Sequence, residues 1–392
     1  MLNQNQENKN LIAIDATRSN THGSKRFIKT ILNGLITFTS LKVIVYARCE
    51  NCDSFNNDRV HVKKIKTKQG GILTIIYATL LIPLLAWRDK AKILYSPWDI
   101  GPLIRPIPFI LGIHSPNCLT PKKYKSQTMP WLHECLTKIS ASKAIGIEMP
   151  SYSAAKDIGN HMGIDSKKIK VIYHGAELSK WNKVITSVER STNNPYIIFW
   201  SWFYRAKNFE TLLRGYKKYI SKYNHNGRHT KKDEDYKEDE KLYCVGKFVS
   251  DDYKREINEL IQELDLTSKV RFFEHPDDEE LVELLYNSKA LVIPSLYETF
   301  GFMYVEGRLF NKPFFVADNE VAREVTEGQC IYFKGLDSDD LAEKMYDNLQ
   351  GEDCKNIDWQ KKYVISEIFF EEYAEKELAK YFNGFFNYDE YR

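Results

Sequence analysis

The feature that most constrains the fold is an alternation of short apolar runs with helical patterns, repeated along the whole chain. The runs are rich in Ile, Val, Leu and aromatic residues, which is typical of parallel strands buried on both faces of a sheet. Seven strands are predicted in the first part of the chain, at 11–17, 41–47, 60–66, 91–97, 107–114, 143–149 and 168–175. Six more are predicted further on, at 196–201, 241–246, 269–274, 290–295, 314–317 and 331–333.

Chain length and one polar segment indicate two domains. A chain of 392 residues is too long for one ordinary core. Residues 182–195 are polar and end in a proline, which is typical of a linker. We therefore predict an α/β protein with two doubly wound, Rossmann-like domains, 1–183 and 184–372, followed by a helical segment, 373–392. Domains of this class bind ligands at the carboxyl ends of their strands.

Charge is distributed unequally along the chain. Residues 1–180 hold 26 Lys or Arg against 12 Asp or Glu, a net charge of +14. The remainder holds 30 against 41, a net charge of −11. A basic half favours contact with an anionic surface or substrate. No zinc-finger, helix-turn-helix or RRM signature is present, so we expect no nucleic acid but rather an anionic membrane surface or a lipid-linked acceptor.

The most apolar run, residues 70–87, is shorter than a membrane-spanning helix, and Pro83 interrupts it. One interpretation, which we favour, is a helix in the core of the first domain. The other is a helix that dips into the lipid headgroup layer beside four basic residues. These are Lys63, Lys64, Lys66 and Lys68.

Other sequence features indicate a cytoplasmic location and no metal site. The polar N-terminus lacks the pattern of a signal peptide, and the seven scattered cysteines, including the pair Cys49 and Cys52, indicate reduced thiols. Asp233 and Asp235 form a D-x-D pattern, but they lie in a charged insertion that we expect to be a solvated loop. We expect a cytoplasmic protein that is peripheral at the inner face of the cytoplasmic membrane.

Two carboxylates interrupt the apolar and aromatic stretch PSLYETFGFMYVEG, residues 294–307. We expect Glu298 in the loop between a buried strand and a helix, and Glu306 about two turns into that helix. A buried carboxylate is costly unless something pairs with it or binds to it. The backbone N–H groups of Phe300 and Gly301, at the helix start, favour an anion such as phosphate. The stretch therefore predicts a ligand site.

The E-x7-E pattern of Glu298 and Glu306 resembles the retaining, GT-B-fold glycosyltransferases of the large family 4 class. Further segments are similar to that family in the same order along nearly the whole chain. They are IDATRSNTHGSKRFIKTIL, GIHSPN, KIKVIYHGAEL, FYRAKNFETLLRGY and NKPFFVADNEVAREV, which ends near the family's usual glutamate at Glu324. The resemblance implies two Rossmann-like domains facing across a cleft, with 373–392 crossing back to the first.

The resemblance also implies how a nucleotide-diphosphate sugar is held. Lys207 would neutralise the diphosphate as it departs, a role suited to a point charge. Glu306 would accept hydrogen bonds from the ribose hydroxyls, and Glu298 from the hydroxyls of the transferred sugar. Phe300 and Gly301 would hold a phosphate through their amides. No metal or other cofactor is expected.

The remaining implied roles involve residues that partly depart from the family. Thr299 takes the place of a common glycine beside the sugar, and Arg205 is a candidate substitute for an arginine that the family has where this chain has Trp202. Gly23 and Ser24 would let a loop of the first domain approach the diphosphate. His114 would contact the donor sugar near the reacting carbon, so that the expected catalytic residues are His114, Glu298 and Lys207.

Three functions stay open at this point. The first is transfer of a hexose from a UDP- or GDP-sugar to a saccharide acceptor in cell-surface polysaccharide or lipopolysaccharide synthesis. The second is a nucleotide-sugar epimerase or a phosphorylase-type relative, for which no signature stands out. The third is a catalytically degenerate paralogue that binds nucleotide sugar or acts as a scaffold, which Ser201, Trp202 and Thr299 keep open.

Overall fold

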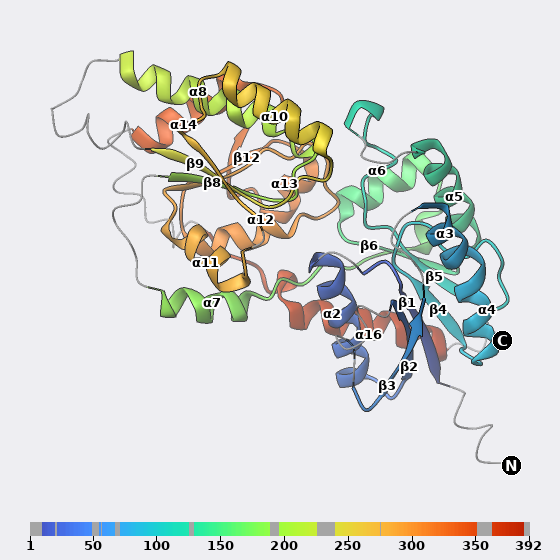
Figure 1. Cartoon of the computed structure of the whole chain (residues 1–392). Coiled ribbons are helices and arrows are strands. Elements are labelled where there is room, and N and C mark those ends of the chain that lie inside the picture. The colour runs from blue at the N-terminus through green and yellow to red at the C-terminus, as the bar shows by residue number, and fades with distance from the viewer. Residues whose placement is uncertain are drawn as a thin grey trace, which may run out of the picture. The chain divides into compact units, whose positions relative to one another are not determined.

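The computed structural model describes residues 10–19, 22–48, 55, 57–66, 71–124, 129–188, 196–225, 240–274, 276–350 and 363–387 (Figure 1). Cys49, Cys52, Lys68 and the D-x-D pair lie outside the described residues. The chain forms two compact units. The first comprises Met1–Leu119, Met129–Gly175 and Ser366–Arg392, and the second comprises Thr120–Thr128 and Ala176–Ile365.

The first unit is built on a seven-stranded sheet in the order β3-β2-β1-β4-β5-β6-β7, in which every neighbouring pair is parallel. The strands are β1 (Leu11–Ala16), β2 (Lys42–Arg48), β3 (Val60–Ile65), β4 (Ile93–Ser96), β5 (Phe109–Gly112), β6 (Gly146–Met149) and β7 (Ile169–Val171). All seven strands predicted from apolar runs are confirmed. The central strands β1, β2, β4, β5 and β6 are buried along most of their length because helices cover the sheet on both faces, whereas the edge strands β3 and β7 contain lysine and are only partly buried.

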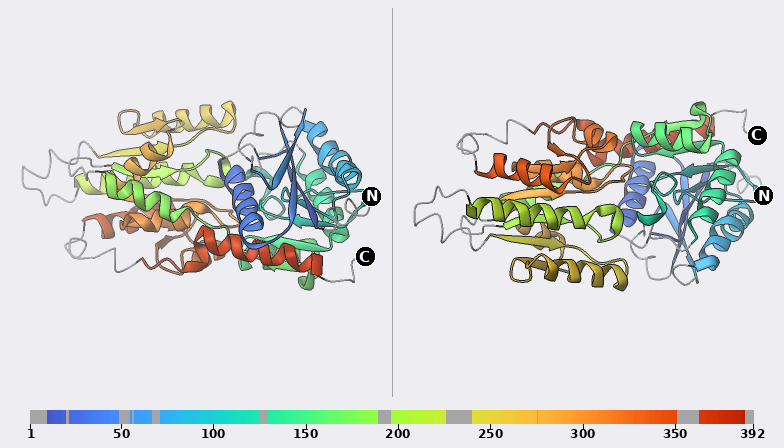
Figure 2. Two further views of the ribbon diagram at one scale, coloured as in Figure 1. Left: turned by 90° about the horizontal axis from the view of Figure 1, so that it is seen from below. Right: turned by 90° about the horizontal axis from the view of Figure 1, so that it is seen from above.

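Two helices cover one face of this sheet. Helix α2 (His22–Phe38) and the last helix, α16 (Glu371–Asn387), pack side by side and share a core cluster that includes Phe27 and Phe382 (Figure 2). Gly34 permits this contact, since a Cβ atom there would lie 2.4 Å from the carbonyl oxygen of Glu375. The aromatic side chain of Phe382 is therefore a core residue of the first unit.

The other face is covered by a long helical segment and two further helices. The segment runs through α3 (Gly71–Ile76), the π-helical turn η2 (Tyr77–Leu81) and α4 (Ile82–Arg88). Helices α5 (Pro130–Lys143) and α6 (Tyr152–Met162) lie on the same face, and together with η2 and α4 they contribute to a second core cluster. The core interpretation of the apolar run is thus confirmed for one side of the segment. No helix among the described residues is long and apolar enough to cross a membrane.

The second unit is built on a six-stranded parallel sheet in the order β10-β9-β8-β11-β12-β13. The strands are β8 (Tyr196–Trp200), β9 (Lys241–Val245), β10 (Val270–Phe273), β11 (Ala290–Ile293), β12 (Phe314–Ala317) and β13 (Ile331–Phe333). All six predicted strands are confirmed. The helices are α7 (Leu178–Ser187), α8 (Phe209–His225), α10 (Asp251–Glu263), α11 (Asp278–Asn287), α12 (Phe302–Glu306), α13 (Glu320–Val325) and α14 (Ser338–Gln350).

Helix α7 corrects the predicted linker. Its residues 182–187 were expected to be irregular, but they continue a helix that packs against α11. The helix forms because Leu178 and Trp181, three positions apart, both turn into the second unit, where the Trp181 ring lies 5.9 Å from that of Phe310. The rest of the expected linker, 189–195, lies outside the described residues.

Candidate functional site

One group of candidate residues lies at the carboxyl edge of the sheet in the second unit. Strands β8 and β11 are neighbours, so the loops that follow them emerge side by side. The amide of Leu296 donates to the carbonyl of Ala206 at 2.9 Å, which ties these two loops together. Asn208, with a left-handed φ of 55°, donates from its side chain to the carbonyl of Pro294 at 3.1 Å. The two loops therefore form one fixed structure.

Lys207 and Glu298, one from each loop, form an ion pair between the lysine Nζ and the carboxylate Oε1. Both side chains are largely buried, with exposed fractions of 7% and 11%. Burial lowers the pKa of the Lys207 ammonium, but the charge of Glu298, together with Tyr204, outweighs it and raises the pKa above its usual value. Lys207 is therefore a permanently charged cation, which is what a phosphate-binding group requires.

Glu306 is buried, as the sequence predicts, but the expected helix is shorter. Helix α12 begins at Phe302, ends at Glu306 and passes into a 3-10 turn, Gly307–Phe310. Gly301 caps it with a φ of +73°, a conformation that other residues rarely adopt. Phe300 and Thr299, just before the cap, are buried. The stretch is thus held rigidly around its two carboxylates.

Arg205, Gly23 and Ser24 were also predicted to contact the donor, and their side chains or backbone have other surroundings than expected. The guanidinium of Arg205 contacts both carboxylate oxygens of Glu256 on α10, at 2.6 and 2.5 Å. This contact, above all, raises the pKa of Arg205. Gly23 and Ser24 lie in the first turn of α2 in the first unit, so the expectation that they belong to a loop is wrong. Their proposed contacts to a diphosphate remain predictions.

A short segment after the first five strands belongs to the second unit and was missed in the sequence. The 3-10 turn Lys122–Tyr124 lies against the turn that carries Lys207. The ring of Tyr124 lies 5.8 Å from that of Tyr297, the residue before Glu298. A basic and aromatic segment therefore adjoins the loop that carries Glu298, and no local sequence signal points to this contact.

A separate group of candidate residues lies in the first unit, around His114. This residue follows β5 by two positions, and its Nε2 lies 2.5 Å from Oε2 of Glu148 on the neighbouring strand β6. Burial lowers the pKa of His114, but Glu148, with a smaller contribution from Asp99, raises it above the usual value. The hydroxyl of Tyr95 donates to the same Glu148 oxygen at 2.8 Å. His114 is therefore held in one orientation, and its raised pKa favours the protonated form.

His174 packs beside this pair. Its ring lies 4.9 Å from that of His114 and 4.5 Å from that of Phe27. Burial, the His114 charge and Arg26 lower its pKa well below the usual value, so it is neutral at pH 7. Two histidines whose pKa values are shifted in opposite directions thus share this edge of the sheet.

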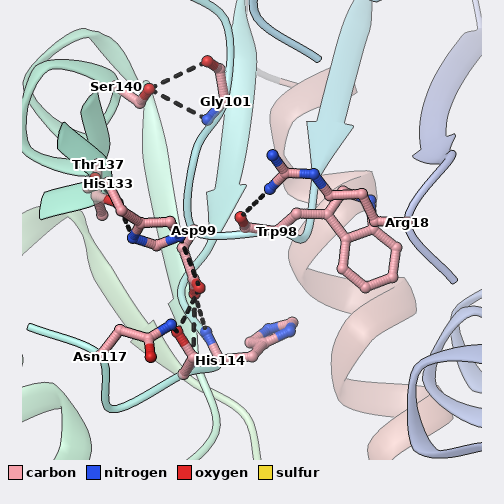
Figure 3. A network of polar contacts seen from close by, with 10 residues as sticks. Arg18, Trp98, Asp99, Gly101, His114, Asn117, His133, Thr137 and Ser140 are labelled. Atoms are coloured by element: carbon pink, nitrogen blue, oxygen red, sulfur yellow. Dashed lines mark hydrogen bonds and ion pairs between the residues drawn. The ribbon is translucent and has the colours of Figure 1, made fainter. Parts of the chain in front are cut away.

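Asp99 organises the loop that follows His114 (Figure 3). Its Oδ1 accepts hydrogen bonds from the amides of His114, at 2.8 Å, and Ser115, at 3.1 Å, while its Oδ2 accepts from the Ser115 hydroxyl. Asn117 donates to that hydroxyl oxygen at 2.6 Å, and Nε2 of His133 lies 3.9 Å from Oδ2. The backbone position of His114 is therefore fixed by a carboxylate.

Asp15, near the end of β1, is another buried acidic residue of the first unit, and Arg18 is the cation close to it. Asp15 is fully buried, and burial raises its pKa despite hydrogen bonds from Thr17. Arg18 donates to the carbonyl of Trp98 at 3.0 Å, and burial lowers its pKa. Sequence reasoning missed Glu148, Asp99 and Asp15. A signal was present for two of them, since Asp15 and Glu148 are single charges within apolar strands.

Comparison with known proteins agrees with this architecture. Residues 183–362 match the family model described as Glycosyl transferases group 1. The O-antigen chain mannosyltransferase RfbU of Salmonella typhimurium is 24% identical over 197 residues, which cover 50% of this chain and 49% of RfbU. The serotype-specific mannosyltransferase WbdA of Escherichia coli is 28% identical over 134 residues, covering 31% of this chain and 16% of WbdA. The match thus spans about half of RfbU and less of WbdA.

A solved structure matches over almost the whole chain. HepE of Anabaena, in complex with UDP-glucose, superposes with a TM-score of 0.67 at 16% identity, covering 95% of this chain and 99% of HepE. At that identity the likeness shows the fold, which is the GT-B fold with its two Rossmann-like units. The family segment 183–362 contains Lys207, Glu298 and Glu306. Residues 183–362 therefore match the glycosyl transferases group 1 family, and the chain as a whole has the GT-B fold.

Proposed function

We propose that the protein is a retaining hexosyltransferase of the family 4 class, which transfers a sugar from a UDP- or GDP-linked donor to a saccharide acceptor. The observation that carries this proposal is the buried Lys207–Glu298 pair at the carboxyl edge of the second sheet. A fixed cation beside a carboxylate suits a donor that has both phosphates and hydroxyl groups. The pair lies in the segment that matches the family.

The ion pair suggests how donor binding proceeds. A diphosphate would replace Glu298 as the partner of Lys207, so the buried ammonium keeps a counter-charge throughout. The released Glu298 carboxylate would then accept hydrogen bonds from the sugar hydroxyls. Glu306 would accept from the ribose. Arg205, Thr299, Phe300, Gly301, Gly23 and Ser24 remain the proposed further donor contacts.

The chemical step needs stabilisation of the departing diphosphate. Lys207 would supply the positive charge, and we propose that no metal ion is required. The imidazolium of His114 would donate to the donor sugar near the reacting carbon. A phosphate oxygen of the leaving group would assist deprotonation of the acceptor hydroxyl. The acceptor oxygen would then bond to the sugar on the same face from which the phosphate departs, which retains the configuration.

The relatives narrow the sugar and acceptor that should be tested. RfbU and WbdA are named mannosyltransferases, RfbU for the O-antigen chain, while HepE was solved with UDP-glucose. We propose a hexose donor and an acceptor in cell-surface polysaccharide or lipopolysaccharide synthesis, linked to a lipid. The +14 charge of residues 1–180 supports an anionic acceptor at the inner face of the cytoplasmic membrane.

The test is a transfer assay with purified protein, UDP-glucose or GDP-mannose, and lipid-linked saccharide fractions as acceptors. We expect turnover with one nucleotide class, an unchanged rate in EDTA, and a product whose anomeric NMR signal shows retention. Glu306→Ala should lower turnover, whereas Lys218→Ala, on the exposed part of α8, should not. Equal donor hydrolysis by wild type and Glu306→Ala, with no transfer, would support the degenerate paralogue instead.

A further inference from the structure

The helical segment of α3, η2 and α4 has one buried side and one exposed apolar side. Its buried side includes Ala78, Ile82 and Ala86, which belong to the core of the first unit. On its other side, five large apolar residues recur at intervals of three or four, which places them on one helical face. These residues, with their exposed fractions, are Leu73 (56%), Ile76 (42%), Leu80 (39%), Leu84 (44%) and Trp87 (59%). We call this set the apolar stripe.

The apolar stripe is held in place even though Pro83 lies in the middle of the segment. Proline has no N–H, so the carbonyl four residues earlier, that of Thr79, loses its helical donor. The amide of Leu103 takes that role and donates to the Thr79 carbonyl at 3.1 Å. The amide of Ile82 donates to the carbonyl of Tyr77, which makes the π turn. The helix therefore continues, and the exposed residues keep one direction.

The charge around the apolar stripe has a single sign. No Asp or Glu occurs between Arg59 and Arg88. Lys64 is exposed on β3, Lys66 is exposed just after that strand, and Arg88 is exposed at the end of the segment. Asp89, the first acidic residue after it, is neutralised by Lys63 at 2.6 Å. An apolar face with basic residues at both ends is complementary to an anionic lipid surface.

We propose that the apolar stripe is a membrane-docking face, which lies flat on an anionic bilayer and inserts its five side chains at the boundary of headgroups and acyl chains. This inference rests on the proposed function in one respect, because a lipid-linked acceptor requires the enzyme at a membrane. A second copy of the chain would place the same basic residues opposite one another. The charges therefore favour lipid over self-association.

The docking face begins at the same edge of the first sheet that carries His114. Strand β3 leads into α3, so the start of the segment lies toward the carboxyl edge of the sheet. His114 follows β5 at that same edge. A lipid-linked acceptor in the bilayer would thus hold its saccharide near the edge of the sheet that carries His114.

The test compares flotation of the full chain with vesicles of phosphatidylcholine alone and with about 30% phosphatidylglycerol. Wild type should bind the anionic vesicles, and high salt should weaken the binding without abolishing it, since the apolar contribution persists. The double variant Leu84→Ser/Trp87→Ser should bind at least about tenfold more weakly than wild type, because two inserted apolar side chains are removed. Lys64→Glu/Lys66→Glu should lose most binding at low salt.

Leu336→Ser is the matched control, since Leu336 is 63% exposed and lies in the second unit. It should bind vesicles as wild type does. In all variants the donor nucleotide should still raise the unfolding temperature as it does in wild type. Failure of membrane docking can therefore be distinguished from failure of the proposed function. Absence of wild-type binding to anionic vesicles, or equal binding by Leu84→Ser/Trp87→Ser, overturns the docking face. A wild-type dimer that Leu84→Ser/Trp87→Ser converts to a monomer overturns it in favour of a self-interface.

Discussion

Lys207 and Glu298 lie 91 residues apart in the chain and meet as a buried ion pair at the carboxyl edge of the second sheet. A buried ion pair is weak evidence for stability, because desolvation offsets much of the attraction. Its position on two loops tied by one backbone hydrogen bond, from Leu296 to Ala206, suits binding better than folding. The predictions below separate these two contributions.

Lys207→Met should reduce both stability and donor use. Removing one partner leaves the Glu298 charge buried, which costs about 3–5 kcal/mol of unfolding free energy. If Lys207 stabilises the leaving diphosphate as proposed, loss of this cation should lower kcat by about 100-fold or more. Urea unfolding and a transfer assay measure the two effects.

The double variant Lys207→Met/Glu298→Gln is the control for that experiment. It removes both charges, so most of the lost stability should return, while donor use should stay low. If stability and activity both returned, the pair would be structural and the assignment of Lys207 to the diphosphate would be wrong.

Glu148→Gln should change the protonation of His114. In the folded wild type the pKa of His114 is raised, so the stabilisation from the pair is fully present below about pH 6.5 and is lost as pH rises through the raised pKa. Without the Glu148 charge, burial dominates and the pKa should fall below its usual value. NMR titration of the histidine ring signals measures this shift, with exposed His161 as internal reference.

If His114 acts on the donor as an imidazolium, the alkaline limb of the pH–rate profile should move to lower pH in Glu148→Gln. A lower His114 pKa with an unchanged profile would leave the residue a structural role only.

Gly246→Ala should destabilise the loop that carries Lys207. Gly246 has a φ of +144°, and a Cβ atom there would lie 1.8 Å from the carbonyl oxygen of Ser201. The variant should lose at least about 2 kcal/mol of unfolding free energy, because both backbone strain and a clash are introduced. Gly163→Ala is the matched control: its φ is +67° but its surroundings are open, so only strain of about 1 kcal/mol is expected. Equal losses in the two variants would contradict the proposed clash.

Much of the fold was predictable because buried parallel strands leave a local pattern. Each of the 13 described strands coincides with a segment that was predicted as a strand. The linker prediction failed at α7 because that helix depends on only two buried residues, Leu178 and Trp181, in a polar segment. The length of α12 also escaped prediction. The helix gives way to a 3-10 turn where Gly307 lies against the Phe314 ring, and local sequence does not specify that contact.

The candidate site was predictable where a charge interrupts an apolar stretch, as at Glu298 and Glu306. The same reasoning applied to β6 would have found Glu148. Pairings are different, because they depend on which loops the sheet order brings together. Lys207 with Glu298 and Arg205 with Glu256 join segments far apart in sequence, so neither was visible before the structure.

Calorimetric titration of donor nucleotides into wild type and Glu306→Gln tests the central claim most directly. We expect UDP or GDP, and the matching nucleotide sugar, to bind wild type, and Glu306→Gln to bind about tenfold or more weakly through loss of charge-assisted hydrogen bonds to the ribose. The unfolding transition of Glu306→Gln should stay close to that of wild type. Absence of binding by any nucleotide to folded wild type, or equal affinity in Glu306→Gln, would contradict the account.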